Sequence, residues 1–148
     1  MKKIIRANTF ETNSSSVHSL SICSSGREPS EFKLNEDGMI EITFGEFGKN
    51  DYLYGSQYDK LSYLITCLHY LSGFYIENIY DNYEFKAIEE AVCEYSGAKG
   101  IKILDYIDPA IDHQSIPEGW IEIINAYDKD EVIDFVFNKY VSLKTTCD

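Results

Sequence analysis

The most constraining feature of this sequence is a stripe of large apolar residues between positions 57 and 71, spaced three and four positions apart. This spacing places the side chains on one face of an α-helix, which must then be buried against another element. We therefore predict a helix over about 57–71, with Gly73 at the position of its C-terminal cap. The members of the stripe are Tyr58, Leu61, Leu64, Ile65, Leu68 and Leu71.

Two further helices are predicted on similar grounds. The first of them begins at Asp81, with Glu84 three residues on as in a capping box, and ends at Gly97. The other is capped by Asp128, with Glu131 at its third position. The side chains expected to face inward are Phe85, Ile88, Val92 and Tyr95 in the first, and Val132, Phe135, Val136 and Tyr140 in the second.

Alternating apolar residues predict strands in the rest of the chain. Asp37-Gly38 indicates a hairpin turn, and the glycine-bearing stretch 45–55 indicates a loop. Residues 120–127 fit either a helix or a strand. Strands are expected on both sides of a polar turn within 6–20, and at 31–34, 39–44, 101–106 and 141–145. The pattern indicates a single α+β domain over 1–148, with a mainly antiparallel sheet and about three helices.

The first strand–turn–strand contains the densest group of hydrogen-bonding side chains in the chain. A turn with successive exposed N–H groups beside cationic side chains is typical of an anion-binding concavity. A polar hairpin loop is the alternative, because Asn, Ser and Thr favour turns in any case. The candidate ligand-binding residues here are Arg6, Asn8, Thr12, Asn13, Ser14, Ser15 and Ser16, followed by His18.

A second polar motif, Asp112-His113-Gln114-Ser115, is expected to fold over the first hairpin, which would add Asp112 and Gln114 to the ligand site. Two facing histidines can serve as general acid and base, so His18 and His113 are candidate catalytic residues together with Ser115. The form His-x-Ser-apolar at 113–116 is that of two-histidine phosphoesterases. His18 departs from it, since leucine stands where the second hydroxyl belongs.

No metal or cofactor is expected. Asp108, Asp112 and His113 are of types that bind metals, but solvated loop aspartates are commoner. The cysteines, Cys23, Cys67, Cys93 and Cys147, show no C-x-x-C spacing and are expected to be free thiols. No apolar run reaches the ~20 residues of a membrane span. We therefore expect a cytosolic protein that does not bind a membrane.

Three motifs also resemble those of a group of small uncharacterised proteins. They are Arg-x-Asn-x-Phe-Glu-Thr-Asn-Ser-Ser-Ser-x-His-Ser from Arg6 to Ser19, Asp112-His113-Gln114-Ser115, and Phe135-Val136-Phe137-Asn138, which is usually nearer Phe-Ile-Phe-Asn. The group they resemble comes from phages and Gram-positive, Firmicute-type bacteria. The resemblance implies a phage or mobile-element origin, and hence the cytosol of a host cell. It brings no established activity.

The charge of the chain is uneven. Residues 1–30 carry four basic and two acidic residues, a formal charge of +2, whereas the remainder carries nine basic and 23 acidic residues, or −14. A region with this much negative charge repels nucleic-acid backbones, so we expect no binding of duplex DNA. The acidic remainder is interspersed with tyrosines, which suit binding surfaces.

These observations favour a non-enzymatic binding protein, such as an inhibitor of a host defence system. It would act through its acidic surface on a host protein, or by holding a phosphate-bearing small ligand on the first hairpin. The alternative is a phosphoester or nucleotide hydrolase that uses His18 and His113. The sequence leaves turnover, the identity of the partner and the oligomeric state open.

Overall fold

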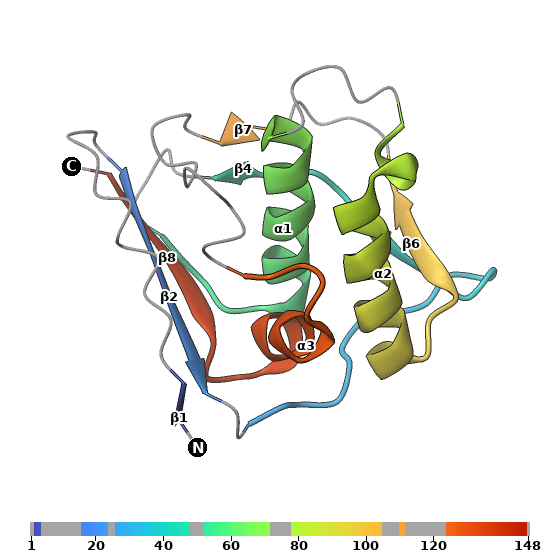
Figure 1. The fold of residues 1–148 in the computed structure, drawn as a ribbon, viewed down its shortest axis with the longest axis horizontal. Helices are drawn as coiled ribbons and strands as arrows, with labels where there is room; N and C mark the ends of the chain where they lie inside the picture. The colour runs from blue at the N-terminus through green and yellow to red at the C-terminus, as the bar shows by residue number, and fades with distance from the viewer. Residues whose placement is uncertain are drawn as a thin grey trace.

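The protein is an α+β fold in which a central helix separates a small antiparallel sheet from a helix-covered pair of parallel strands (Figure 1). The computed structural model describes residues 2–3, 16–23, 26–47, 52–71, 78–104, 110–111 and 124–147. Its helices are α1 (Gln57–Leu71), the 3-10 turn η2 (Ile79–Asp81), α2 (Tyr83–Ser96) and α3 (Lys129–Phe137). Its strands are β1 (Lys2–Lys3), β2 (Ser16–Cys23), β3 (Met39–Ile42), β4 (Glu46–Phe47), β5 (Tyr52–Tyr54), β6 (Gly100–Ile103), β7 (Ala110–Ile111) and β8 (Ser142–Cys147).

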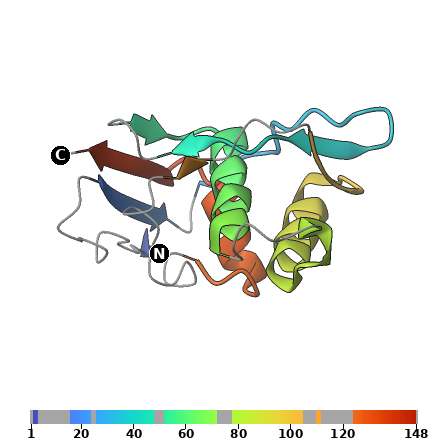
Figure 2. The ribbon, with the colours of Figure 1, turned by 90° about the horizontal axis from the view of Figure 1, so that it is seen from above.

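Helix α1 is the centre of the fold. Figures 1 and 2 both show it between the strands β2 and β8 on one side and α2 with β6 on the other. Every residue from 60 to 69 is buried, so the helix has no wetted face along this stretch. A helix that is buried on all sides belongs in a core. The sequence prediction of a helix over 57–71 is confirmed, but Tyr58 of the predicted stripe is 40% exposed.

The strands form one antiparallel sheet and two parallel pairs. The sheet has the order β1-β2-β8-β5, and β2 and β8 run antiparallel with Leu20 opposite Leu143. Strand β3 pairs in parallel with β6, and β4 with β7. The prediction of a mainly antiparallel sheet therefore holds for the first sheet only. Parallel strands need a long crossover, and α1, η2 and α2 supply it between β3 and β6.

The outer edge of β6 is covered by side chains. The backbone N–H of Ile101 donates to Glu89 Oε2 at 2.9 Å, and that of Ile103 donates to the Tyr80 hydroxyl at 2.9 Å. Glu89 comes from α2, and Tyr80 from η2. These N–H groups alternate with those that face β3, because successive residues of a strand point in opposite directions.

The observed ends of α2 and α3 differ from the prediction in two places. Helix α2 starts at Tyr83 with Asn82 as its N-cap, since Asn82 Oδ1 accepts from the Phe85 N–H at 2.9 Å. The predicted start at Asp81 was wrong, because that residue belongs to η2. Gly97 ends α2 with a φ of 80°, as predicted. The cap of α3 at Asp128 is also confirmed, but Tyr140 lies beyond the helix and is exposed.

Three shorter segments also differ from prediction. The stretch 45–55 was predicted as a loop and contains β4 and β5. The hairpin turn at Asp37-Gly38 is present, with a φ of 75° at Gly38, but residues 31–34 contribute one bridge, between Leu34 and Ile40, and no strand. The described part of 120–127 is a turn at 124–127, so neither alternative holds there. In each case the local pattern was too short to fix the pairing partner.

Residues 26–31, which we call the strap, run from β2 across the end of α3. The Glu28 N–H donates to the Phe137 carbonyl at 2.8 Å, and the Lys139 N–H donates to the Gly26 carbonyl at 3.0 Å. Gly26 has a φ of 120°, and a Cβ built there would lie 2.5 Å from Tyr140 Cδ2. The strap therefore requires glycine at its first residue.

No helix in the described ranges is both long and apolar enough to cross a bilayer.

Replacing Gly26 with alanine should lower the free energy of unfolding by about 2 kcal/mol, from left-handed strain and the clash with Tyr140. Gly55→Ala is the matched control, because its added Cβ would meet nothing within 4 Å. Urea unfolding of the two variants and the wild type measures the difference. Equal stability of the two variants would contradict the role assigned to Gly26.

Candidate functional site

The residues predicted to form the polar site lie mostly outside the described residues. This is true of Arg6, Asn8, Thr12, Asn13, Ser14 and Ser15 in the first motif, and of Asp112, His113, Gln114 and Ser115 in the second. Ser16 and His18 lie on β2, where they are opposite Cys147 and Thr145 of β8. The strand predicted after the polar turn is therefore confirmed. The meeting of the two motifs stays a prediction.

Among the described residues, the outer sides of α2 and α3 form a continuous charged surface. Tyr83, Glu90 and Glu94 are seven and four positions apart on α2, so they share one face of that helix. Lys129, the first residue of α3, lies 3.1 Å from Glu90 Oε1 and 2.8 Å from Glu94 Oε2. These contacts join the face of α2 to the first turn of α3.

We call this surface the acidic face and define it by four carboxylates and two tyrosines. The carboxylates are exposed, with 69% of the Glu90 side chain, 61% of Glu94 and 82% of Asp130 accessible. Tyr83 and Tyr127 are among the most exposed large side chains of the described residues, at 78% and 59%. The members of the face are Tyr83, Glu90, Glu94, Tyr127, Asp128 and Asp130.

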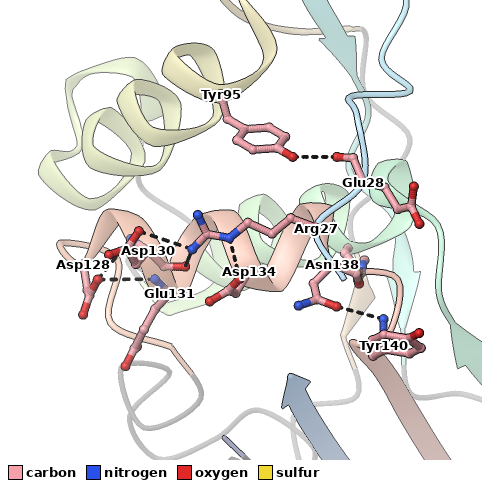
Figure 3. Close-up of polar contacts among 10 residues, drawn as sticks. Arg27, Glu28, Tyr95, Asp128, Asp130, Glu131, Asp134, Asn138 and Tyr140 are labelled. Carbon is pink, nitrogen blue, oxygen red and sulfur yellow. Dashed lines mark hydrogen bonds and ion pairs between the residues drawn. The ribbon is translucent and has the colours of Figure 1, made fainter. Parts of the chain in front are cut away.

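Arg27 of the strap binds two carboxylates of α3, one in its first turn and one a turn further on (Figure 3). Its Nε lies 2.6 Å from Asp134 Oδ1, and its Nη2 lies 3.2 Å from Asp130 Oδ1. The hydrogen bond to Asp134, with that to Asp130, raises the pKa of Arg27. Exposed ion pairs contribute little to stability, but Asp134 is largely buried, so this one holds a defined position.

A buried lysine joins α1 to the segment between α3 and β8. Lys60 is 1% exposed, and its Nζ donates to the carbonyls of Asn138 at 3.0 Å and Val141 at 3.2 Å. Burial lowers the pKa of Lys60 to about 8, against an opposing effect of the Glu31 carboxylate. Sequence reasoning missed this residue, because it lies beside the apolar stripe that defined the helix.

Gln57, one turn before Lys60, holds the strap against α1. Its Oε1 accepts from the Glu31 N–H at 2.7 Å, and its Nε2 donates to the Pro29 carbonyl at 3.0 Å. From the other side, the Tyr95 hydroxyl of α2 donates to the Glu28 carbonyl at 2.8 Å (Figure 3). Side chains of α1, α2 and α3 therefore converge on one short segment.

The remaining titratable groups of the core have structural roles. Burial raises the pKa of the Cys67 thiol to about 12 and that of Cys93 to about 11, so neither is a reactive thiolate. His69 is buried with its ring 5.0 Å from Phe44, and burial lowers its pKa. Within the described ranges, no group of three or more His, Cys, Asp or Glu side chains is arranged to hold a metal ion.

Comparison with known proteins found no match for this chain among protein-family models, curated proteins or solved structures. The resemblance of its motifs to those of phage and Firmicute-type proteins accordingly stays a prediction.

The buried ammonium of Lys60 predicts a specific pH dependence. Between pH 8 and 10.5 the folded protein releases a proton that the unfolded chain still binds, so the free energy of unfolding rises with pH. Relative to Lys60→Met, the wild type should gain about 3 kcal/mol at most across this range. Urea unfolding of both proteins at pH 7, 8.5 and 10 measures the gain.

The comparison with Lys60→Met is needed because the buried thiols act in the opposite direction. Their raised pKa values make the folded state retain protons that the unfolded chain loses above pH 9. Both proteins contain these thiols, so their effect cancels in the difference. A difference in stability that does not change with pH would show that the Lys60 amine is not held in a charge-disfavouring environment.

Proposed function

We propose that this protein is a non-enzymatic binding protein that captures a basic protein partner on the acidic face. The observation that carries the proposal is the joined surface of α2 and α3, on which Glu90, Glu94 and Asp130 are exposed at positions fixed by rigid helices. The proposal extends to a phage or mobile-element origin and to inhibition of a host system in the host cytosol, on the strength of the three sequence motifs.

Electrostatics favours a basic partner. The chain carries a net charge of −12, and two of the cations that contact the acidic face, Lys129 and Arg27, are already bound to its carboxylates. A third, Lys86, lies 6.0 Å from the centre of the Tyr83 ring. A field of one sign steers an oppositely charged protein into contact and repels proteins and nucleic acids of the same sign. A basic surface, such as one that normally binds nucleic acid, is the matching partner, and duplex DNA itself is not.

The exposed tyrosines add to this argument. Tyr83 lies about two turns before Glu90 on the same face of α2, and Tyr127 directly precedes Asp128, the N-cap of α3. Tyrosine combines a large apolar ring with a hydroxyl, and aromatic residues are enriched in the buried centres of protein interfaces. Rings set among carboxylates can stack on the guanidinium groups of a basic partner. The acidic face thus combines affinity from the rings with selectivity from the charges.

The proposal is tested by capturing partners from the cytosolic extract of a Gram-positive bacterium on the immobilised protein. Glu90→Gln with Glu94→Gln removes two charges from the acidic face. Glu36→Gln with Asp37→Asn removes two from the turn before β3 and serves as the matched control. We expect the partner to bind the wild type and the control, and to bind the first variant at least tenfold more weakly.

Binding to the wild type should also weaken steeply between 50 and 300 mM salt, because exposed charges are screened. Equal binding by both double variants, or binding that salt does not affect, would refute the acidic face as the interface.

The hydrolase alternative and the phosphate-bearing ligand both depend on the first hairpin. Incubation of the pure protein with a panel of nucleotides, followed by mass spectrometry, separates them from partner capture. Turnover that is lost in His18→Ala and in His113→Ala would establish the hydrolase and end the non-enzymatic proposal. Unmodified nucleotide that co-purifies with the protein, and is lost in Arg6→Ala, would support ligand binding instead.

A further inference from the structure

The ammonium group of Lys60 is buried without an ion pair to any described residue, although the charge of the Glu31 carboxylate acts on it. Its two hydrogen-bond partners are neutral backbone carbonyls, and no carboxylate of the described residues forms an ion pair with it. An ammonium group has three N–H donors, so one is left over. With a pKa of about 8, roughly nine-tenths of these groups are charged at pH 7. A buried charge of this kind is costly unless something pairs with it.

Lys60 lines a cavity of about 110 Å³ between α1 and the end of α3. Gln57, Lys60 and Asn138, which are buried, form its inner part, and Glu28 and Lys139, which are half exposed, lie towards the solvent. Its volume corresponds to roughly three to four waters at liquid density, the size of a carboxylate with one or two carbons. The uncompensated ammonium is therefore next to a space that a small group can enter.

Asn138 lines the same cavity and carries a side-chain donor without a partner. Its Oδ1 accepts from the Tyr140 N–H at 3.0 Å, but its Nδ2 has no hydrogen-bond partner although the residue is fully buried (Figure 3). No other buried side-chain nitrogen or oxygen in the described part of the chain is left unsatisfied in this way. An unpaired buried N–H costs about as much as a lost hydrogen bond, so an acceptor in the cavity would be stabilised.

The charges that line the cavity limit the ligand to one negative charge. Lys139 Nζ lies 3.4 Å from Glu28 Oε1, which pairs these two groups with each other. Glu31 also lines the cavity, and its carboxylate repels an anion with two charges more strongly than one with a single charge. We infer that this cavity is a binding site for a monoanionic carboxylate, held by the Lys60 ammonium with Asn138 Nδ2 as the second donor.

This site is separate from the acidic face, and its inference does not depend on the proposed function. A carboxylate has two oxygens at a fixed angle, so it can accept from both donors at once. The same chemistry is found in a free small acid and at the end of a peptide chain. Acetate represents the first source, and N-acetylglycine the second.

The test is ¹⁹F NMR of fluoroacetate with the full chain at constant ionic strength, followed by competition with acetate, N-acetylglycine, acetamide and chloride. We expect saturable binding that acetate displaces and that neither acetamide nor chloride displaces. Displacement by N-acetylglycine at a lower concentration than acetate would identify a chain end as the source. The reverse order would identify a free acid.

Because pH sets the charge of Lys60, the affinity for fluoroacetate measured against pH tests the role of Lys60 without a variant. Affinity should fall about tenfold from pH 6.5 to 9 as Lys60 loses its proton, while the raised pKa of Lys139 keeps that group charged. Lys60→Met should abolish binding, and Lys86→Met, on the surface of α2, should leave it unchanged. Binding that does not saturate, does not change with pH, survives in Lys60→Met or is displaced equally by acetamide would overturn the inference. If Lys60→Met does not fold, the pH series decides alone.

Discussion

The way in which α3 and β8 meet α1 depends on the hydrogen bonds of one buried amine, that of Lys60. Lys60 donates to the carbonyl of Asn138, the C-cap of α3, where the helix dipole leaves partial negative charge, and to that of Val141, just before β8. The residues that follow it along α1, 61–69, are all buried, so the ammonium is anchored to the core. This contact orients α3 relative to α1, and the orientation of α3 in turn sets the acidic face and the path of β8.

The strap, which follows β2 of the antiparallel sheet in the chain, is bound to the same helices. It is held by Gln57 from α1, Tyr95 from α2 and Asp134 from α3. Each of these contacts uses a different kind of donor: an amide, a phenol and a guanidinium. Polar side chains from three helices therefore fix the strap in place.

Elements with a long local pattern could be predicted from the sequence, and elements defined by distant pairing could not. The stripe from Tyr58 to Leu71 predicted α1, and Asp128 predicted the start of α3. The cap predicted at Gly73 lies outside the described residues. Two-residue strands such as β4 and β7 have no period to detect, and strand direction depends on the crossover. Lys60 was missed because a lysine beside an apolar stripe is ordinarily solvated. The predicted polar site rests on side chains outside the described residues.

The covering of β6 has a consequence for how molecules of this protein meet one another. A bare strand edge is a template on which further chains can add, and repeated addition leads to aggregates. Glu89 and Tyr80 already occupy the outward N–H groups of Ile101 and Ile103, so this edge offers no donors to an incoming strand. The acidic chain can in this way stay dispersed, because further strands cannot add to this edge of its parallel pair.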